Sequence, residues 1–79
     1  KVSELMMSKL TNIQIETLRL VADGLTNAEI GRIRFVSEKA VEQIVSRISQ
    51  VLNVQPDKTK NMRVQLVRQY FIWIGAPIH

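Results

Sequence analysis

The segment TNAEIGRIRFVSEKAVEQIVSRI, residues 26–48, predicts two helices joined by a tight turn. Its opening residues TNAE form a capping box, in which the Thr26 hydroxyl accepts from the Glu29 amide and the Glu29 side chain reaches back. Ser37 is a good N-cap for the second helix, which continues to about residue 53. Because so few residues separate the helices, they must cross sharply, as in a helix-turn-helix.

Helix boundaries are also marked on either side of this segment. Residues 11–14, TNIQ, form another capping box, and Gly24 ends the helix that follows as a left-handed cap. A last helix is expected over about 58–74, with Asp57 or Thr59 as its N-cap.

Apolar spacing indicates which side of each helix faces the core. In the helix after Thr11 we expect Ile13, Leu18 and Val21 to point inward, and in the next helix Ile30 and Ile33. In the helix after Ser37 the inward residues are Val41, Val45, Ile48 and Leu52.

Four helices joined by short turns predict a compact all-α, four-helix domain that contains a helix-turn-helix. A chain of 79 residues is one domain at most. We assign residues 10–79 to this domain and residues 1–9 to a leading segment, with a loose helix over 2–8.

Composition excludes several kinds of site. The chain has no cysteine and a single histidine, His79, so we expect neither a metal site nor a cofactor. Carboxylates are scattered, no serine has a histidine partner and no glycine-rich phosphate loop occurs, so an enzyme is not expected. No apolar run reaches the roughly 20 residues of a membrane span. The net charge of +4 favours a polyanionic partner such as nucleic acid.

Residues 10–54 resemble the DNA-binding domain of LuxR-type (GerE-like) transcription factors and response regulators. The family pattern combines Leu-Thr, a helix ending in A-x-G, L-[ST]-N-x-x-I-[AG], a recognition helix with a small or hydroxyl residue followed by Val, and L-x-V. This chain supplies LT at 10–11, ADGL at 22–25, TNAEIG at 26–31, VSEKAV at 36–41 and LNV at 52–54. A promoter-reading sigma-factor domain shares the fold, but the short loop and GLTNAEI favour the LuxR type.

The sequence departs from that family's pattern at several positions. Relatives usually carry Arg-Glu where this chain has Ile13-Gln14, and Thr where it has Ala40. They usually carry Lys or another polar residue at Glu42 and His at Ile44. Because these last two positions touch or flank DNA in relatives, the resemblance implies the fold more firmly than the contacts.

The side of the 37–53 helix opposite its apolar stripe is the candidate DNA-binding face, with its N-terminal half in the major groove. Gln43 matches an adenine edge, and Glu42 can accept from a cytosine amino group. The N-terminus of the helix that begins at Thr26 presents free amides at Thr26, Asn27 and Ala28, which favour phosphate. Arg32 and Arg34 flank the turn as further phosphate contacts or as solvated charges. The DNA-binding candidates are Thr26, Asn27, Arg32, Ser37, Lys39, Glu42, Gln43, Ser46 and Arg47.

The last helix carries more apolar residues than a small core can take, which predicts an interface. We expect Leu66, Tyr70 and Trp73 to form a dimer interface, the role this helix has in relatives. In the alternative, residues 1–9 fold back and cover the patch with Val2, Leu5, Met6 and Met7.

The resulting hypothesis is a cytoplasmic, homodimeric output domain of a bacterial transcriptional regulator of the response-regulator type, which binds a specific sequence of double-stranded DNA. We expect the regulatory domain to belong to the full-length chain and to lie outside this sequence. The chain starts without an initiator methionine, so we expect it to be part of a longer protein. The rival hypothesis is a protein-interaction helix-turn-helix with weak or no DNA binding, which docks another regulator or polymerase through the last helix.

Overall fold

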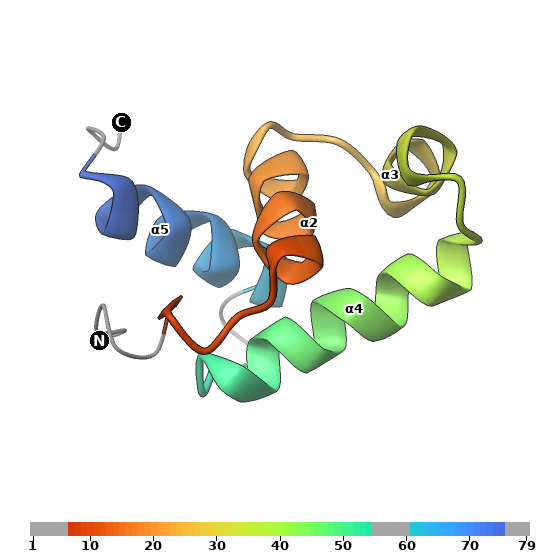
Figure 1. Cartoon of the computed structure of the whole chain (residues 1–79). Helices are drawn as coiled ribbons and strands as arrows, with labels where there is room; N and C mark the ends of the chain where they lie inside the picture. The colour runs from red at the N-terminus through yellow and green to blue at the C-terminus, as the bar shows by residue number, and fades with distance from the viewer. Residues whose placement is uncertain (1–6, 55–60, 76–79) are drawn as a thin grey trace.

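The computed structural model describes residues 7–54 and 61–75. Four α-helices lie within these ranges, and no strand occurs in them (Figure 1). The predicted all-α, four-helix domain is therefore confirmed. The helix expected over residues 2–8 falls almost entirely outside the described residues. The helices are α2 (Asn12–Ala22), α3 (Asn27–Arg34), α4 (Glu38–Val51) and α5 (Met62–Ile74).

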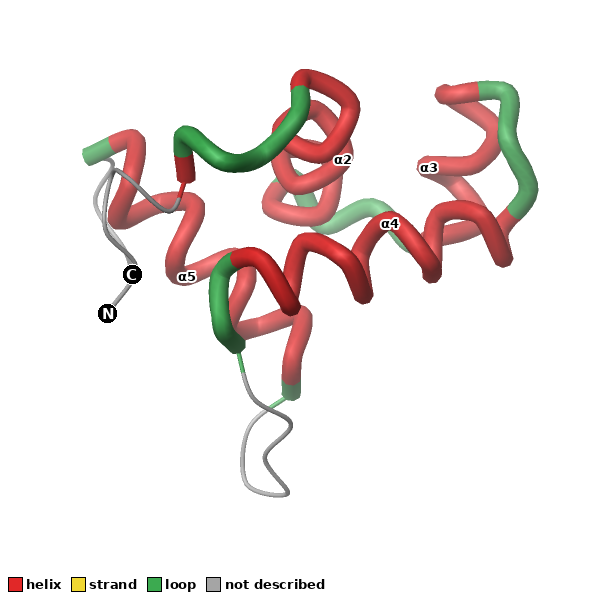
Figure 2. The backbone as a smooth tube through the Cα atoms, turned by 60° about the horizontal axis from the view of Figure 1, so that its bottom comes forward, coloured by secondary structure: helices red, strands yellow, loops and turns green. Residues whose placement is uncertain are grey.

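Helix α2 stands at the centre of the domain. It packs against α5 on one side and against α3 and α4 on the other, while α3 also packs against α4 (Figure 1, Figure 2). In Figure 1, α4 runs diagonally beneath α2 and α3. One long side of α4 is therefore covered by other helices and the opposite side faces outward. Across the described residues, no helix is long and apolar enough to cross a membrane.

Helices α2, α3 and α4 begin where their capping residues predict. Thr11 Oγ1 accepts from the Gln14 amide at 3.2 Å, and Gln14 Oε1 accepts from the Thr11 amide at 2.9 Å. Thr26 and Glu29 make the same reciprocal pair at 3.2 and 2.8 Å. Ser37 Oγ accepts from the third amide of α4 at 3.0 Å. All three predicted N-caps are confirmed, because each satisfies a backbone donor that the helix leaves unpaired.

The start of α5 differs from the prediction. Its N-cap is Asn61, whose Oδ1 accepts from the Arg63 amide at 2.7 Å, rather than Asp57 or Thr59. The asparagine side chain competes well for this position because its short carbonyl reaches the backbone two residues on.

Each of the four helices is followed, within two residues of its end, by a residue with positive φ. The left-handed residues are Gly24 (φ 89°), Phe35 (φ 59°), Asn53 (φ 56°) and Gly75 (φ 77°). Glycine and asparagine accept this conformation readily, whereas a phenylalanine there is unusual. The Phe35 side chain is 93% exposed, so contacts within the protein do little to offset that cost.

The turn of the helix-turn-helix depends on Gly31. A Cβ atom at this position would lie 2.6 Å from the Val36 carbonyl oxygen. The Val36 amide meanwhile donates to the Gly31 carbonyl oxygen at 2.9 Å, which closes the turn. A residue without a side chain therefore lets α4 begin this close to α3.

Each of the four helices contributes to one hydrophobic core, together with Met7 and Leu10 from the segment before α2. The core side chains are at most 6% exposed. They are Met7, Leu10, Leu18, Val21, Ile30, Val41, Val45, Ile48, Leu52 and Leu66.

Two residues expected in this core are on the surface. Ile13 is 54% exposed and Ile33 is 51% exposed, so both predictions are wrong. In α3 the buried side is set by Ile30 and Gly31. Ile33 lies about 200° around the helix from Gly31 at 3.6 residues per turn, which turns it outward. Ile13 likewise lies about 140° around α2 from Leu18 and about 80° from Val21, at the edge of the buried stripe.

Candidate nucleic-acid interface

The outward side of α4 carries a continuous polar surface. Its inward residues Val41, Val45 and Ile48 are at most 4% exposed, and Ser49 is buried with its hydroxyl donating to the Val45 carbonyl at 3.0 Å. The exposed side chains are Glu38, Lys39, Glu42, Gln43, Ser46, Arg47 and Gln50. The predicted candidates on this helix therefore share one accessible face.

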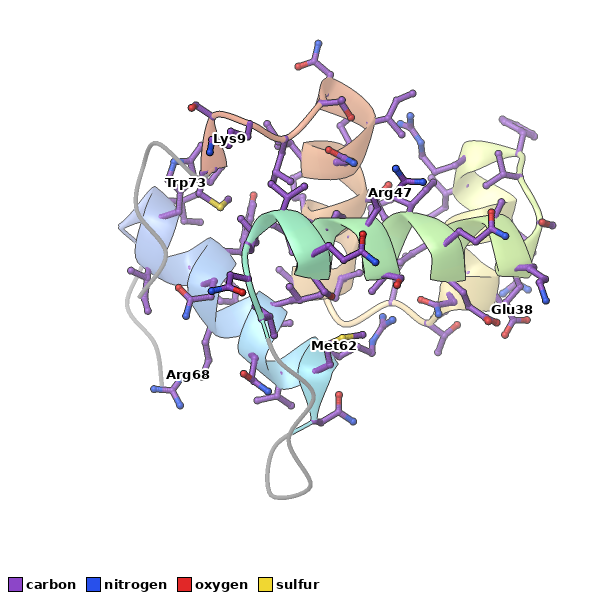
Figure 3. The ribbon with its side chains drawn as sticks, turned by 90° about the horizontal axis from the view of Figure 1, so that it is seen from below. Lys9, Glu38, Arg47, Met62, Arg68 and Trp73 are labelled. Atoms are coloured by element: carbon purple, nitrogen blue, oxygen red, sulfur yellow. The ribbon has the colours of Figure 1, made fainter. Side chains whose placement is uncertain are left out.

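Charge is distributed unevenly across that face. At about 100° per residue, Glu38 and Glu42 fall on one edge, while Gln43 and Arg47 fall on the other and Lys39 lies between them. Figure 3 shows Arg47 on the side of α4 next to α2, and Glu38 near the far end of the helix. A polyanion would therefore be attracted to the edge of α4 that borders α2.

An open cleft of about 350 Å³ lies at this edge. It is lined by Gln14 from the first turn of α2 and by Ala40, Gln43, Ile44 and Arg47 from α4. None of the described residues that line it is acidic. Three of them, Gln14, Ala40 and Ile44, are positions where the sequence departs from the pattern that it resembles. These three residues come from different parts of the sequence but line the same cleft. Compared with the residues of the family pattern, they make the cleft less polar and free of carboxylates.

The N-terminus of α3 is less open to an anion than the sequence suggests. The Thr26 amide, expected to be free, donates instead to Glu29 Oε1 at 2.8 Å. Hydrogen bonds from the Thr26 backbone, and then from its side chain, hold the pKa of the Glu29 carboxyl below its ordinary value, with a smaller contribution from the charge of Arg32. A phosphate at this helix end would therefore meet an ionised carboxylate as well as free donors.

Asn27 is held by a residue that sequence reasoning missed. Its Oδ1 accepts from Arg63 Nη1 at 2.5 Å, and Arg63 Nη2 donates to the Leu25 carbonyl oxygen. This bond leaves the Asn27 amide nitrogen as the group that can donate to a ligand. No local pattern marks Arg63, because its partners lie 36 and 38 residues away.

The two arginines at the turn have different surroundings. Arg34 Nη1 is bonded to Glu16 Oε2, which ties the end of α3 to α2. Arg32 is exposed and lies close enough to Glu29 to lower the pKa of that carboxyl. Of the pair, Arg32 is the better candidate for a phosphate contact.

The residues expected at a dimer interface lie mainly on the inner side of α5. Leu66 is fully buried in the core, so the prediction that it is a surface residue is wrong. Tyr70 packs against the core and Trp73 is 37% exposed, their ring centroids 6.1 Å apart. The three residues are spaced i, i+4 and i+7, and the face they share is turned toward the rest of the domain.

The outward side of α5 carries other apolar groups. Val64 is 55% exposed and Ile72 is 45% exposed, with Arg68 between them and partly buried Phe71 beside them. We call these four residues the outer face of α5. Sequence reasoning missed this face because the direction of the core around α5 depends on where α2 lies.

The segment before α2 also contributes to packing at this end of the domain. Met7 is fully buried and Leu10 is 6% exposed. Figure 3 shows Lys9 beside Trp73, so the described end of the segment lies along the inner side of α5. Val2, Leu5 and Met6, which were expected to cover the apolar patch in the alternative arrangement, lie outside the described residues.

Comparison with known families gives one finding. The family model for bacterial regulatory proteins of the luxR family (GerE) matches residues 8–68, which is most of the chain. Neither a curated protein nor a solved structure matches it significantly. The matched range runs from the segment before α2 into the middle of α5, so it includes the whole polar face of α4 and its cleft.

Proposed function

Since the chain belongs to the luxR family of bacterial regulatory proteins and carries its DNA-binding helix-turn-helix, we propose that it binds a specific double-stranded DNA sequence with α4 in the major groove. The observation that carries this proposal is the polar outward face of α4 beside a cleft without carboxylates. Fourteen helical residues give a rod about 21 Å long, enough to cross the groove.

The side chains in the middle of the exposed face of α4 contact the base edges. Gln43 can donate to and accept from an adenine edge, and Ser46 reaches a base or a phosphate. Glu42 accepts from a cytosine amino group, with Lys39 three residues earlier as its neighbouring cation. Because an unpaired carboxylate is repelled by phosphates, Glu42 penalises wrong sequences more than it adds affinity.

One DNA strand lies along the cleft between α2 and α4. Deoxyribose packs against Ala40 and Ile44, and the adjoining phosphate meets Arg47. Further phosphate contacts come from the Ser37 hydroxyl and from Lys39, and from Thr26, Asn27 and Arg32 around the N-terminal end of α3. Gln14 is neutral, so this part of the cleft holds no carboxylate that would repel the strand.

Two protomers pair through the outer face of α5, which exposes Val64 and Ile72. An exposed apolar group of this size on a helix favours a partner surface. The interface is then centred on Val64, Arg68, Phe71 and Ile72, while Tyr70 and Trp73 support it from behind. The α4 face of one protomer carries few cations, so a single protomer binds DNA weakly. Dimerisation adds the contacts of the second protomer, which high affinity requires.

The domain serves as the output module of a transcriptional regulator of the response-regulator type, acting in the cytoplasm, and another domain supplies its signal. Selection of bound sequences from a random double-stranded DNA pool tests the central proposal. We expect an enriched inverted repeat. Failure to enrich any sequence would contradict sequence-specific binding.

Salt dependence tests the phosphate contacts separately. With Arg32, Lys39 and Arg47 each neutralising one phosphate per protomer, a dimer should show a log Kd against log salt slope with a magnitude of about 5. A flat dependence would argue against this mode of binding.

Glu42→Ala tests the role of the carboxylate. We expect tighter binding to unrelated DNA and a smaller ratio of specific to non-specific affinity. Complete loss of binding, or no change, would contradict the assignment of Glu42 as a group that rejects wrong sequences.

A protein-interaction module is the second candidate, and one observation favours it. Phe35 is 93% exposed beside Ile33 and Val36, which are 51% and 42% exposed, at the turn between α3 and α4. If replacing Gln43 and Arg47 leaves regulatory activity intact while Phe35→Ser or Trp73→Ser abolishes it, the protein-interaction function is the correct one.

A further inference from the structure

Arg63 joins two parts of the domain that the proposed function uses separately. It sits in the first turn of α5, one residue before Val64 of the outer face. Its guanidinium donates to the Leu25 carbonyl oxygen and to Asn27 Oδ1, the latter at 2.5 Å. These acceptors flank Thr26, the N-cap of α3. Arg63 therefore connects the start of α5 to the start of α3.

The geometry of these bonds suits arginine specifically. Two nitrogens of one rigid, planar group reach two acceptors, so both acceptors are held in a fixed relation to α5. A lysine has a single ammonium on a flexible stem and would hold such a pair less firmly. The site is partly buried, which weakens competition from water for both bonds.

The bond to Asn27 also decides which way its amide group acts. With Oδ1 occupied by Arg63, the NH₂ group is the part of the side chain left to donate. The guanidinium charge, bonded to the amide oxygen, polarises that amide and makes its NH₂ group a stronger donor. Both effects favour an anion as the acceptor.

We propose that Arg63 is a positioning residue for DNA binding, which acts through Asn27. It orients the Asn27 amide to donate to a backbone phosphate and fixes the start of α3 relative to the outer face of α5. The inference rests on the proposed function, because it needs Asn27 to contact phosphate. Both terminal nitrogens of Arg63 are bonded within the domain, so its effect on DNA binding passes through Asn27 and the start of α3.

The test compares Arg63→Gln, Asn27→Ala and the double variant on the selected DNA site, each measured across a range of salt. Arg19→Gln is the control, because it removes an arginine at an exposed position of α2 that lies in neither the proposed DNA-binding surface nor the proposed dimer interface. Urea unfolding of every variant gives the folded fraction by which the affinities are corrected.

We expect Arg63→Gln and Asn27→Ala each to weaken binding about tenfold, and the double variant to be no weaker than either one. The dependence of affinity on salt should have the same slope in Arg63→Gln and Asn27→Ala, because both changes remove the same contact, the one between Asn27 and phosphate. Arg63→Lys should recover only part of the affinity. Arg19→Gln should leave affinity within about twofold of the parent protein.

Asn27→Asp keeps the inference testable if Arg63→Gln unfolds the domain. The carboxylate would bond Arg63 more strongly and suit the N-terminal end of a helix, so the variant should be at least as stable as the parent. It lacks the donor and brings a negative charge to the phosphate, so its DNA affinity should fall more than tenfold.

Three results would overturn the inference while leaving DNA binding in place. They are additive losses from Arg63→Gln and Asn27→Ala, a loss of affinity explained entirely by the folded fraction, and an Asn27→Asp variant that binds as tightly as the parent. A parent protein that binds no DNA would overturn the proposed function and this inference together.

Discussion

Replacing Leu66 by alanine tests whether this residue of α5 lies in the core, as in the structure, or at a surface interface, as the sequence predicted. The Leu66 side chain is fully buried among residues of the same chain. The substitution removes three carbons, worth about 2.4 kcal/mol at roughly 0.8 kcal/mol per buried CH₂ group. The cavity left behind adds to this, so we expect a loss of about 3–4 kcal/mol in the free energy of unfolding.

A loss of this size is a large fraction of the total for a small domain. At roughly 0.05–0.15 kcal/mol per residue, this chain should have an unfolding free energy of about 4–12 kcal/mol. A loss of 3 kcal/mol would lower the Tm by roughly 12–24 °C in a domain of this size. The variant should therefore be close to unfolding at ordinary temperatures.

Ile72→Ala provides a matched control on the same helix. Ile72 is 45% exposed, so its truncation removes much less buried surface and should cost under about 1 kcal/mol. Urea unfolding at several protein concentrations measures stability, and sedimentation measures self-association. We expect Leu66→Ala to lose stability at every concentration, and Ile72→Ala to lose self-association.

The reverse pattern would refute the reasoning. If Leu66→Ala unfolds like the parent and instead sediments as a monomer, then Leu66 faces a partner. The assignment of the inner and outer sides of α5 would then be wrong.

Three further substitutions test the cleft, the turn between α3 and α4, and the cap of α3. Gln14→Glu should raise the unfolding free energy by about 0.5 kcal/mol, because it gives the capping box a charged acceptor. It should also weaken DNA binding several-fold, because the new carboxylate faces the DNA strand and Ile13 supplies no offsetting charge. Unchanged binding would place the DNA strand elsewhere. Phe35→Gly should raise the Tm by a few degrees, because glycine adopts the left-handed conformation at φ 59° without strain and the lost side chain is 93% exposed. A marked fall in Tm would mean that the phenylalanine ring packs against the domain. The folded-state pKa of Glu29 lies below its ordinary value of 4.5, so its stabilising contribution is present above that pH and is lost as pH falls through the lowered value. Glu29→Gln should therefore flatten the acid limb of a plot of stability against pH, and an unchanged limb would contradict the cap's role.

The features that sequence predicted well are local ones. The pairs Thr11–Gln14 and Thr26–Glu29 each span three residues, so the partners are adjacent once a helix begins. Ser37 and Gly24 act within one turn of their own helices in the same way. Residue type and spacing suffice in such cases, because the bonding partners come from the same short stretch of chain.

Predictions about which side of a helix is buried were less secure. Helix α4 has a strongly one-sided apolar pattern, and its inward residues were correctly identified. Helices α3 and α5 carry apolar residues on more than one side, so pattern could not choose among them. The neighbouring helices made the choice. Helix α2 covers the side of α5 that carries Leu66 and leaves Ile72 exposed, while α4 and α2 cover the side of α3 opposite Ile33.

By itself, then, the sequence determined the helices, the N-caps of α2, α3 and α4, the helix-turn-helix and the family, because each depends on short-range bonding or on ordered local motifs. Only the tertiary structure decided that Gln14 joins Ala40 and Ile44 in one cleft, that Arg63 holds Asn27, and that Val64 and Ile72 form the outer face of α5. These relations join residues on different helices, or depend on which side of a helix its neighbours cover. They are fixed when the helices pack together, which the spacing of residues along the chain does not specify.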